Sequence, residues 1–318
     1  MKAIVYTTYG SPDVLHYVDI EKPSVGDDQV LIKIRAASVN ALDWHYLRGT
    51  PYVARVVFGL RKPKLTQPGA DVAGEVEAVG RNVTQFKPGD KVFGAGRRSF
   101  AEYVSASESK LVLKPDNVTF EQAAAVPVAA LTALQGLRDS GKIQSGQKVL
   151  VDGAGGGVGT FAVQIAKSYG TEVTATCSTK NVDMVRSIGA DHVIDYTQED
   201  VTRTGRQYDL IFAANGFHSL TGYRRALNPG GSFVMAGGAM PLLFRLTVLG
   251  PLLSMTGKKM LGVMANINQQ DLVYLKGLLE AGKVKPVIDR RYPLRDAADA
   301  IRYIEEGHAR GKVVITLG

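Results

Sequence analysis

The residues with the clearest chemical potential are five glycines between positions 153 and 159, which separate a short apolar strand from a helix with one apolar face. Glycines in such a turn let the backbone approach a pyrophosphate, whose charge is bound by free N–H groups at the start of the helix. The spacing Ala154-x-Gly156-x-x-Gly159 alone is weak and would also suit a flexible surface loop. The flanking strand and helix favour a dinucleotide site, whose candidate contacts are Gly153, Ala154, Gly155, Gly156, Gly157, Val158 and Gly159.

The residues after the next strand favour one dinucleotide over the other. An NAD site needs Asp or Glu about 20 residues beyond the glycines, where it binds the ribose 2′-hydroxyl. Here the chain has hydroxyl side chains, including Ser178, followed by Lys180, and no acidic residue occurs before Asp183. This set suits a 2′-phosphate and therefore predicts NADPH, although Lys180 would also suit a solvated surface.

Other catalytic patterns are absent from the sequence. No serine lies in Gly-x-Ser-x-Gly and no His-Glu-x-x-His occurs, so hydrolase chemistry has no supporting motif. No tyrosine is followed four residues later by lysine, the acid–base pair typical of short-chain dehydrogenases. The five histidines are scattered, which argues against a zinc site of three or four ligands.

Length and composition indicate two domains in a reducing compartment. A chain of 318 residues can bury a core without disulfides, and the single Cys177 cannot form an internal one. No apolar run has membrane-spanning length and no signal peptide is evident, so we expect a cytoplasmic protein. The net charge of +8 has local concentrations at residues 55–64 and 97–98. It fits solvated basic faces and an anionic dinucleotide better than nucleic acid, because no nucleic-acid motif accompanies it.

The expected secondary structure that positions the candidate site residues differs between the first 120 residues and the rest of the chain. Residues 1 to about 120 are β-rich, with expected strands at 2–6, 15–20, 29–37, 73–79, 91–94, 101–105 and 111–114. Strands then alternate with helices, which predicts a parallel, doubly wound sheet; the later strands are 149–151, 171–177, 192–195, 208–213 and 232–236. At the carboxyl edge of such a sheet lie four more candidate cofactor contacts, or plain turn residues: Asn215, Gly216, Gly237 and Gly238. The remaining expected elements are helices at 121–125, from 127, at 268–281 and at 296–306, with strands near 286 and at 312–317.

Residues 241–264 form the most apolar stretch of the chain. Arg245, Pro251 and two lysines interrupt it, so a membrane span is not expected. A wall of the substrate pocket, a subunit contact and ordinary core remain open as interpretations.

As a set, the motifs resemble those of zinc-free medium-chain dehydrogenases/reductases of the quinone oxidoreductase type. The matching segments follow the family's order over nearly the full length: 38–40 with Asp43, 68–74, 86–92, 131–133, 153–159, 189–191, 195–196 and 311–314. Segment 307–312, with Ser178 and 195–196, is most similar to the branch of reticulon-interacting mitochondrial oxidoreductases and chloroplast enone reductases.

The resemblance implies an α/β protein of two domains. Residues 1–120 and 266–318 would form a GroES-like, partly open β-barrel catalytic domain, and residues 121–265 a Rossmann NADP-binding domain with a doubly wound parallel sheet. It also implies a homodimer. Zinc-dependent relatives carry a cysteine and a Gly-His-Glu segment where this chain has 38–40 and 69–71, so the resemblance implies no metal.

The resemblance also implies residue roles. Asn40 faces the active site and can donate to a substrate oxygen, although asparagine also commonly ties down its own turn. His45 and Tyr46 lie near the position of a family tyrosine and are further catalytic candidates, with a structural role as the alternative for His45. Thr132 matches a threonine beside the nicotinamide and Tyr196 a tyrosine on the 2′-phosphate, and Lys312 is a further candidate cofactor contact.

These features predict hydride transfer from NADPH to a quinone or an α,β-unsaturated carbonyl. The cofactor carries the hydride, and the protein supplies orientation and hydrogen bonds to the developing oxyanion. Two alternatives remain: an NADPH-binding sensor or interaction protein with little turnover, and a reductase of enoyl thioesters.

Overall fold

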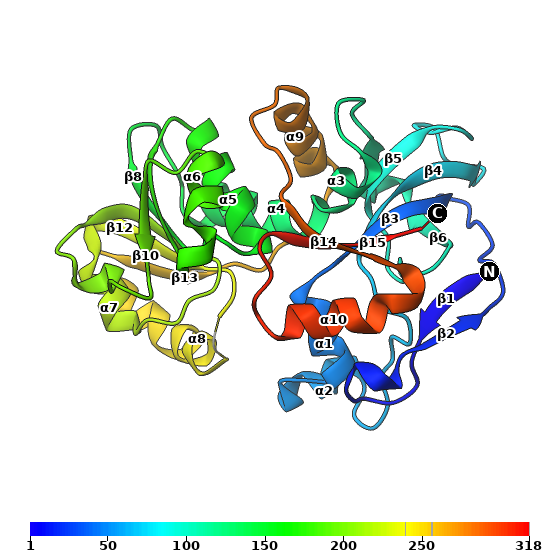
Figure 1. The fold of residues 1–318 in the computed structure, drawn as a ribbon, viewed down its shortest axis with the longest axis horizontal. Helices are drawn as coiled ribbons and strands as arrows, with labels where there is room; N and C mark the ends of the chain where they lie inside the picture. Colours follow the sequence, from blue (N-terminus) through cyan, green and yellow to red (C-terminus); the bar gives the residue numbers. More distant parts are fainter. Residues whose placement is uncertain (239, 256, 318) are drawn as a thin grey trace. The chain divides into compact units, whose positions relative to one another are not determined.

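The computed structural model describes residues 1–238, 240–255 and 257–317, which form two compact units (Figure 1). Unit 1 consists of Met1–Val128, Ile267–Ala281 and the chain from Ile288 onward. Unit 2 consists of Ala129–Asn266 and Gly282–Val287. Both ends of the chain therefore belong to unit 1.

Unit 1 is built on a seven-stranded, mainly antiparallel sheet with the order β14-β15-β3-β4-β5-β7, and β6 also pairs with β3. A separate antiparallel pair, β1 with β2, lies at the N-terminus. The strand bounds are β1 Lys2–Val5, β2 His16–Asp19, β3 Gln29–Val39, β4 Asp71–Val79, β5 Lys91–Ala95, β6 Tyr103–Ser107, β7 Leu111–Leu113, β14 Ile288–Pro293 and β15 Lys312–Thr316. Because β3 pairs with both β4 and β15, it brings the two ends of the chain into one sheet.

Unit 1 also contains helices, and some of them pack on this sheet. Their bounds are α1 Ala41–Arg48, α2 Arg55–Phe58, α3 Phe120–Ala124, α9 Gln269–Glu280 and α10 Ala297–Glu305, and α4 Pro127–Gln135 leads into unit 2. Helix α10 has apolar residues at positions 297, 300, 301 and 304, a spacing that places them on one helix face. That face packs in a core cluster with Leu47 of α1 and Val313 of β15.

Unit 2 is a six-stranded parallel sheet with the order β10-β9-β8-β11-β12-β13. Its strands are β8 Lys148–Asp152, β9 Glu172–Cys177, β10 His192–Asp195, β11 Tyr208–Ala213, β12 Leu227–Met235 and β13 Lys259–Gly262, and its helices include α5 Gly157–Ser168, α6 Val182–Ser187, α7 Leu220–Arg225 and α8 Met240–Ser254. Figure 1 shows α5 and α6 on one side of the sheet and α7 and α8 on the other. The strand order reverses between β8 and β11, which is where sheets of this kind bind their ligand.

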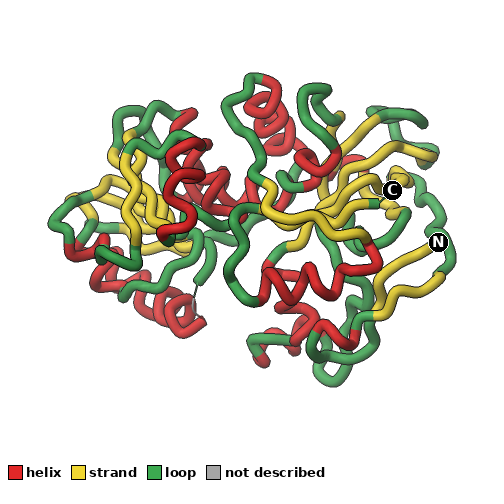
Figure 2. Tube along the Cα trace, viewed as in Figure 1, coloured by secondary structure: helices red, strands yellow, loops and turns green. Residues whose placement is uncertain are grey.

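The predicted parallel, doubly wound sheet is confirmed, and several short elements were not predicted (Figure 2). Helices α1, α2, α6 and α7 have eight residues or fewer, and β13 has four, too few for a hydrophobic period to show in the sequence. The apolar stretch 241–264 contains α8 and β13. Within the described ranges, no helix is long and apolar enough to cross a membrane.

Candidate functional site

The glycine loop connects β8 to α5 at the point where the strand order reverses. Gly153 has φ +82° and donates its N–H to Thr176 Oγ1 at 3.1 Å, while Ala154 N donates to Thr176 O at 2.8 Å. These bonds hold the start of the loop against the end of β9. Gly156 then caps α5 in an extended conformation, so the helix begins with free N–H groups beside the loop.

Two glycines of this loop have different surroundings. A Cβ built on Gly159 would lie 2.1 Å from Gly153 O and 2.7 Å from Ala154 Cα, so α5 packs directly on the loop backbone there. A Cβ on Gly156 would meet only Gly153 O, at 3.8 Å. Gly159 therefore serves close packing, whereas Gly156 leaves open space beside the helix N-terminus, which is the cradle that a pyrophosphate requires.

We expect Gly159→Ala to lower the free energy of unfolding by about 1–3 kcal/mol, because the new Cβ displaces backbone atoms. Gly156→Ala is expected to leave stability within about 0.5 kcal/mol and to weaken NADPH binding, because its methyl group enters the open space. Urea unfolding and a fluorescence titration with NADPH measure the two effects. Equal losses of stability in the two variants would contradict this division of roles.

The predicted contacts for the 2′-phosphate lie at the ends of neighbouring strands. Strands β9 and β10 are paired through Cys177 and Asp195, and Tyr196 N donates to Cys177 O at 3.0 Å. Ser178 and Lys180 follow directly after β9, and the Lys180 and Tyr196 side chains are exposed. The structure thus brings the three predicted residues to one edge of the sheet, and their contact with a phosphate remains a prediction.

The two other predicted glycine turns also meet. Gly216 N donates to Gly237 O at 2.9 Å, and Gly216 and Gly238 form an isolated parallel bridge. Gly238 has φ +136°, and a Cβ there would lie 2.2 Å from Gly216 O. Asn215 N lies near Asp152 O at 3.4 Å, so these turns sit next to the glycine loop.

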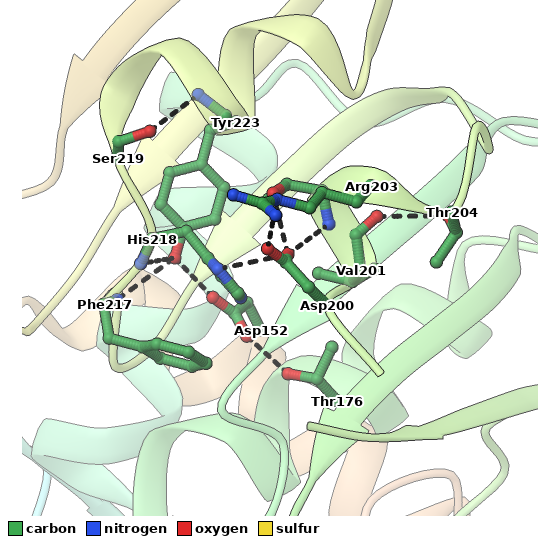
Figure 3. A network of polar contacts seen from close by, with 12 residues as sticks. Asp152, Thr176, Asp200, Val201, Arg203, Thr204, Phe217, His218, Ser219 and Tyr223 are labelled. Carbon is green, nitrogen blue, oxygen red and sulfur yellow. Dashed lines mark hydrogen bonds and ion pairs between the residues drawn. The ribbon is translucent and has the colours of Figure 1, made fainter. Parts of the chain in front are cut away.

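Sequence analysis missed a buried carboxylate that ties these loops together (Figure 3). Asp152, the last residue of β8, is fully buried and accepts hydrogen bonds from Thr176 Oγ1 and Tyr223 OH. The same tyrosine oxygen accepts N–H groups of Phe217 and His218, at 3.2 and 3.4 Å. Burial raises the pKa of Asp152 above its ordinary value, and the two hydroxyl donors oppose that shift. The sequence did contain a signal for this buried carboxylate, because Asp152 stands directly between an apolar strand and the glycines.

Unit 1 contains a second buried polar network, centred on Asn40 and Asp71. Asn40 is 8% exposed, and its Nδ2 donates to Asp71 Oδ2 at 2.8 Å and to Ser38 O at 3.3 Å. Asp71 Oδ2 also accepts Ser38 Oγ at 2.6 Å, and Asp71 Oδ1 accepts Val128 N at 2.9 Å. Both carboxylate oxygens of a fully buried aspartate are therefore satisfied.

Lys312 completes this network. The sequence did not predict that Lys312 would be buried beside Asn40 and Asp71. It is 3% exposed, and its Nζ donates to Asn40 Oδ1 at 2.6 Å and to Val39 O at 3.2 Å. Its Nζ also lies 3.7 Å from Asp71 Oδ2. Burial lowers the pKa of Lys312, while Asp71 and Asp43 oppose this effect. The Asn40 amide is thus held at both ends, and the predicted contact of Lys312 with the cofactor remains untested.

Asp43 lies in the first turn of α1 and fixes the start of this helix next to Asn40. Its Oδ2 accepts Asn40 N at 2.8 Å and its Oδ1 accepts Gly69 N at 2.9 Å. Burial raises the pKa of Asp43 to about 6, although the two backbone donors oppose that rise.

This shift predicts a pH dependence of stability. A carboxyl with a raised pKa binds its proton more tightly when folded, so its contribution falls as pH rises from about 4 to about 6 and then stays constant. The loss is about 3 kcal/mol, and Asp43→Asn is expected to remove it. The measurement is urea unfolding of both proteins at pH values on either side of this window. Parallel pH curves for the two proteins would show that Asp43 titrates normally.

The other two catalytic candidates lie on α1. His45 stacks on Trp44 with ring centroids 3.6 Å apart, and its Nδ1 lies 3.2 Å from Thr50 O. Burial lowers the pKa of His45, and the backbone contact with Thr50 opposes that shift. Tyr46 packs against Phe58 with centroids 4.1 Å apart.

Thr132, the residue predicted to lie beside the nicotinamide, is half-buried on α4 in unit 2.

No metal centre is formed by the residues that the structure describes, since nowhere in them do three or more His, Cys, Asp or Glu side chains group suitably. Residues 26–116 match the family described as alcohol dehydrogenase GroES-like domain, and residues 188–315 match the one described as zinc-binding dehydrogenase.

Comparison with known proteins found relatives that match over nearly the whole of this chain. The chain is 38% identical to the quinone-oxidoreductase homolog of chloroplasts from Spinacia oleracea, over 99% of this chain and 98% of the relative. It is also 38% identical to the chloroplastic NADPH-dependent alkenal/one oxidoreductase of Arabidopsis thaliana, over 99% of this chain and 79% of the relative. Among solved structures, the quinone oxidoreductase from Coxiella burnetii covers 100% of this chain and 99% of its own, with a TM-score of 0.89 and 32% identity. The predicted α/β class with a GroES-like domain is confirmed.

Proposed function

Because the chain belongs to the quinone oxidoreductase family of medium-chain dehydrogenases/reductases, we propose that it transfers a hydride from NADPH to a quinone or an α,β-unsaturated carbonyl. The observation that carries this proposal is the glycine loop after β8, with its open space at Gly156 and the N-terminus of α5 beside it. No acidic residue follows β9 before Asp183, and Ser178, Lys180 and Tyr196 supply hydroxyls and a cation for the 2′-phosphate.

The chain's own residues hold the cofactor and fix its orientation. Residues 153–159 bind the pyrophosphate through backbone N–H groups, and Ser178, Lys180 and Tyr196 bind the 2′-phosphate. Thr132 and the turns at 215–216 and 237–238 border the nicotinamide half. When bound, NADPH supplies the hydride.

On the substrate side, we assign Asn40 as a donor to the carbonyl oxygen. Its shorter Nδ2 bond, 2.8 Å to Asp71, positions the amide, and its 3.3 Å bond to Ser38 O is the one that a substrate oxygen would replace. The donor stabilises negative charge as the oxygen becomes enolate-like, and water then supplies the proton. His45 and Tyr46 are further candidate donors.

Several features belong to the same proposal. The reaction is zinc-independent, which is supported by Ser38–Asn40 and Gly69–Asp71 at the positions of zinc ligands in zinc-dependent relatives. The proposal also includes a cytoplasmic location, for which the free, buried Cys177 fits a reducing compartment, and a homodimer, which rests on the family resemblance alone. The proposed catalytic domain, residues 1–120 and 266–318, corresponds largely to unit 1, and the proposed cofactor domain, residues 121–265, largely to unit 2; the units differ in that 121–128 belong to unit 1 and 266 and 282–287 to unit 2.

The test is oxidation of NADPH and of NADH in the presence of a small quinone or a medium-chain enone. We expect turnover with NADPH on at least one acceptor and much slower turnover with NADH. Tight NADPH binding without turnover on either acceptor would favour the binding protein, and turnover only on an enoyl thioester would favour that class of substrate.

A further inference from the structure

A short segment of unit 1, Tyr52–Lys64, presents large apolar side chains to solvent. It comprises a turn at Tyr52–Ala54, helix α2 and the loop that follows, and is called the 52–64 surface below. Its exposed apolar residues are Tyr52 (74%), Val53 (77%), Val56 (67%), Val57 (71%) and Leu60 (71%). Scattered exposed apolar residues are ordinary, but a contiguous patch marks an interaction site.

The 52–64 surface has a defined shape. Tyr9 OH donates to Gly59 O at 2.7 Å, and Lys64 N donates to Phe58 O at 2.7 Å. Arg55 Nε donates to Gly49 O at 3.0 Å, with its guanidinium over the Tyr9 ring. These contacts turn Phe58 and Arg55 inward and leave the apolar side chains outward, and Figure 1 shows α2 projecting beyond the strands of unit 1.

The charged side chains of this segment are all cations. Residues 44–70 contain no Asp or Glu, and the exposed Arg61, Lys62 and Lys64 follow Leu60 closely in the sequence. The nearby Arg48 is paired with Glu305. Apolar side chains bordered by cations match the boundary between acyl chains and anionic headgroups of a bilayer.

We propose that the 52–64 surface docks the protein on an anionic lipid bilayer. The apolar side chains enter the headgroup region, and the three cations contact lipid phosphates. A second copy of the chain is a poorer occupant, because a twofold interface uses the same patch on both copies and this segment has no carboxylate to pair with its cations. This inference goes beyond the proposed function and does not depend on it.

The test compares binding to phosphatidylcholine vesicles with and without phosphatidylglycerol, by co-sedimentation of the full chain. We expect binding only to the anionic vesicles, with loss of binding when salt rises from about 0.1 M to about 1 M and the screening length falls from about 10 Å to about 3 Å. Replacing Arg61, Lys62 and Lys64 together with glutamine should weaken binding about 100-fold.

Matched variants separate this site from net charge. Lys87, Lys110 and Lys283 are exposed elsewhere, and replacing these three with glutamine removes the same charge. That variant is expected to bind within about 3-fold of the wild type if the site is local. Val53→Asp with Val57→Asp should abolish binding, whereas Val273→Asp, at a 55% exposed position of α9, should not.

Three outcomes would overturn the proposal. The first is equal binding of the wild type to neutral and anionic vesicles. The second is an equal loss of vesicle binding when either set of three cations is replaced with glutamine. The third is self-association of the wild type that Val57→Asp abolishes. Circular dichroism shows whether each variant is folded, and the salt dependence of the wild type tests the proposal without any variant.

Discussion

Replacing Lys312 with methionine is expected to lower the free energy of unfolding by about 3–5 kcal/mol. The methionine has a similar length but no charge, so it leaves the buried carboxylates of Asp43 and Asp71 without the ammonium that faces them. Asn40 Oδ1 also loses its donor at 2.6 Å. Urea unfolding at pH 7 measures the loss.

A double-mutant cycle tests the origin of this loss. Asp71→Asn removes one buried negative charge, so the pair Lys312→Met and Asp71→Asn should be less destabilised than the sum of the single variants. Lys33→Met, at an exposed position of β3, is the control and should change stability by less than about 0.5 kcal/mol. Additive losses, or a loss below about 1 kcal/mol for Lys312→Met, would contradict a charged network.

Asn40→Ala is expected to lower kcat about 100- to 1000-fold, because the variant cannot donate to the developing oxyanion. NADPH binding should be unchanged, since Asn40 is not among the residues proposed to hold the cofactor. Steady-state kinetics with saturating NADPH, together with an NADPH titration, measure the two quantities. Asn117→Ala, which removes a 2.9 Å bond to Leu279 O in the same unit, is the control and should keep kcat.

The alternative for Asn40 is a purely structural role in its own turn. In that case the activity of Asn40→Ala would fall only in proportion to its unfolded fraction. Unfolding curves recorded under the assay conditions give that fraction, so the two roles make different predictions for the same protein.

The sequence predicted the glycine turn between a strand and a helix because its signal is local. The glycines, the strand before them and the helix after them are contiguous, and each follows from backbone sterics. The predicted sheet then brought Asn215–Gly216 to Gly237–Gly238 and Tyr196 to the end of β9, because parallel strands end at one edge.

The polar networks were not predictable in the same way. Asp71 and Lys312 are 241 residues apart (312 − 71) and meet only because β3 pairs with both β4 and β15. Asp152, at the end of β8, meets Tyr223 of α7, which is 71 residues further along the chain. A single sequence shows such acidic residues next to apolar strands, but the partner of each depends on the folded topology.

Hydride transfer from NADPH can be followed with an isotope label. NADPH deuterated at C4 on either face is incubated with the enzyme and an enone, and the saturated product is analysed by mass spectrometry. We expect one of the two labelled cofactors to deliver one deuterium to the β-carbon, with the α-hydrogen coming from water. A reduced product without deuterium from either cofactor would contradict hydride transfer.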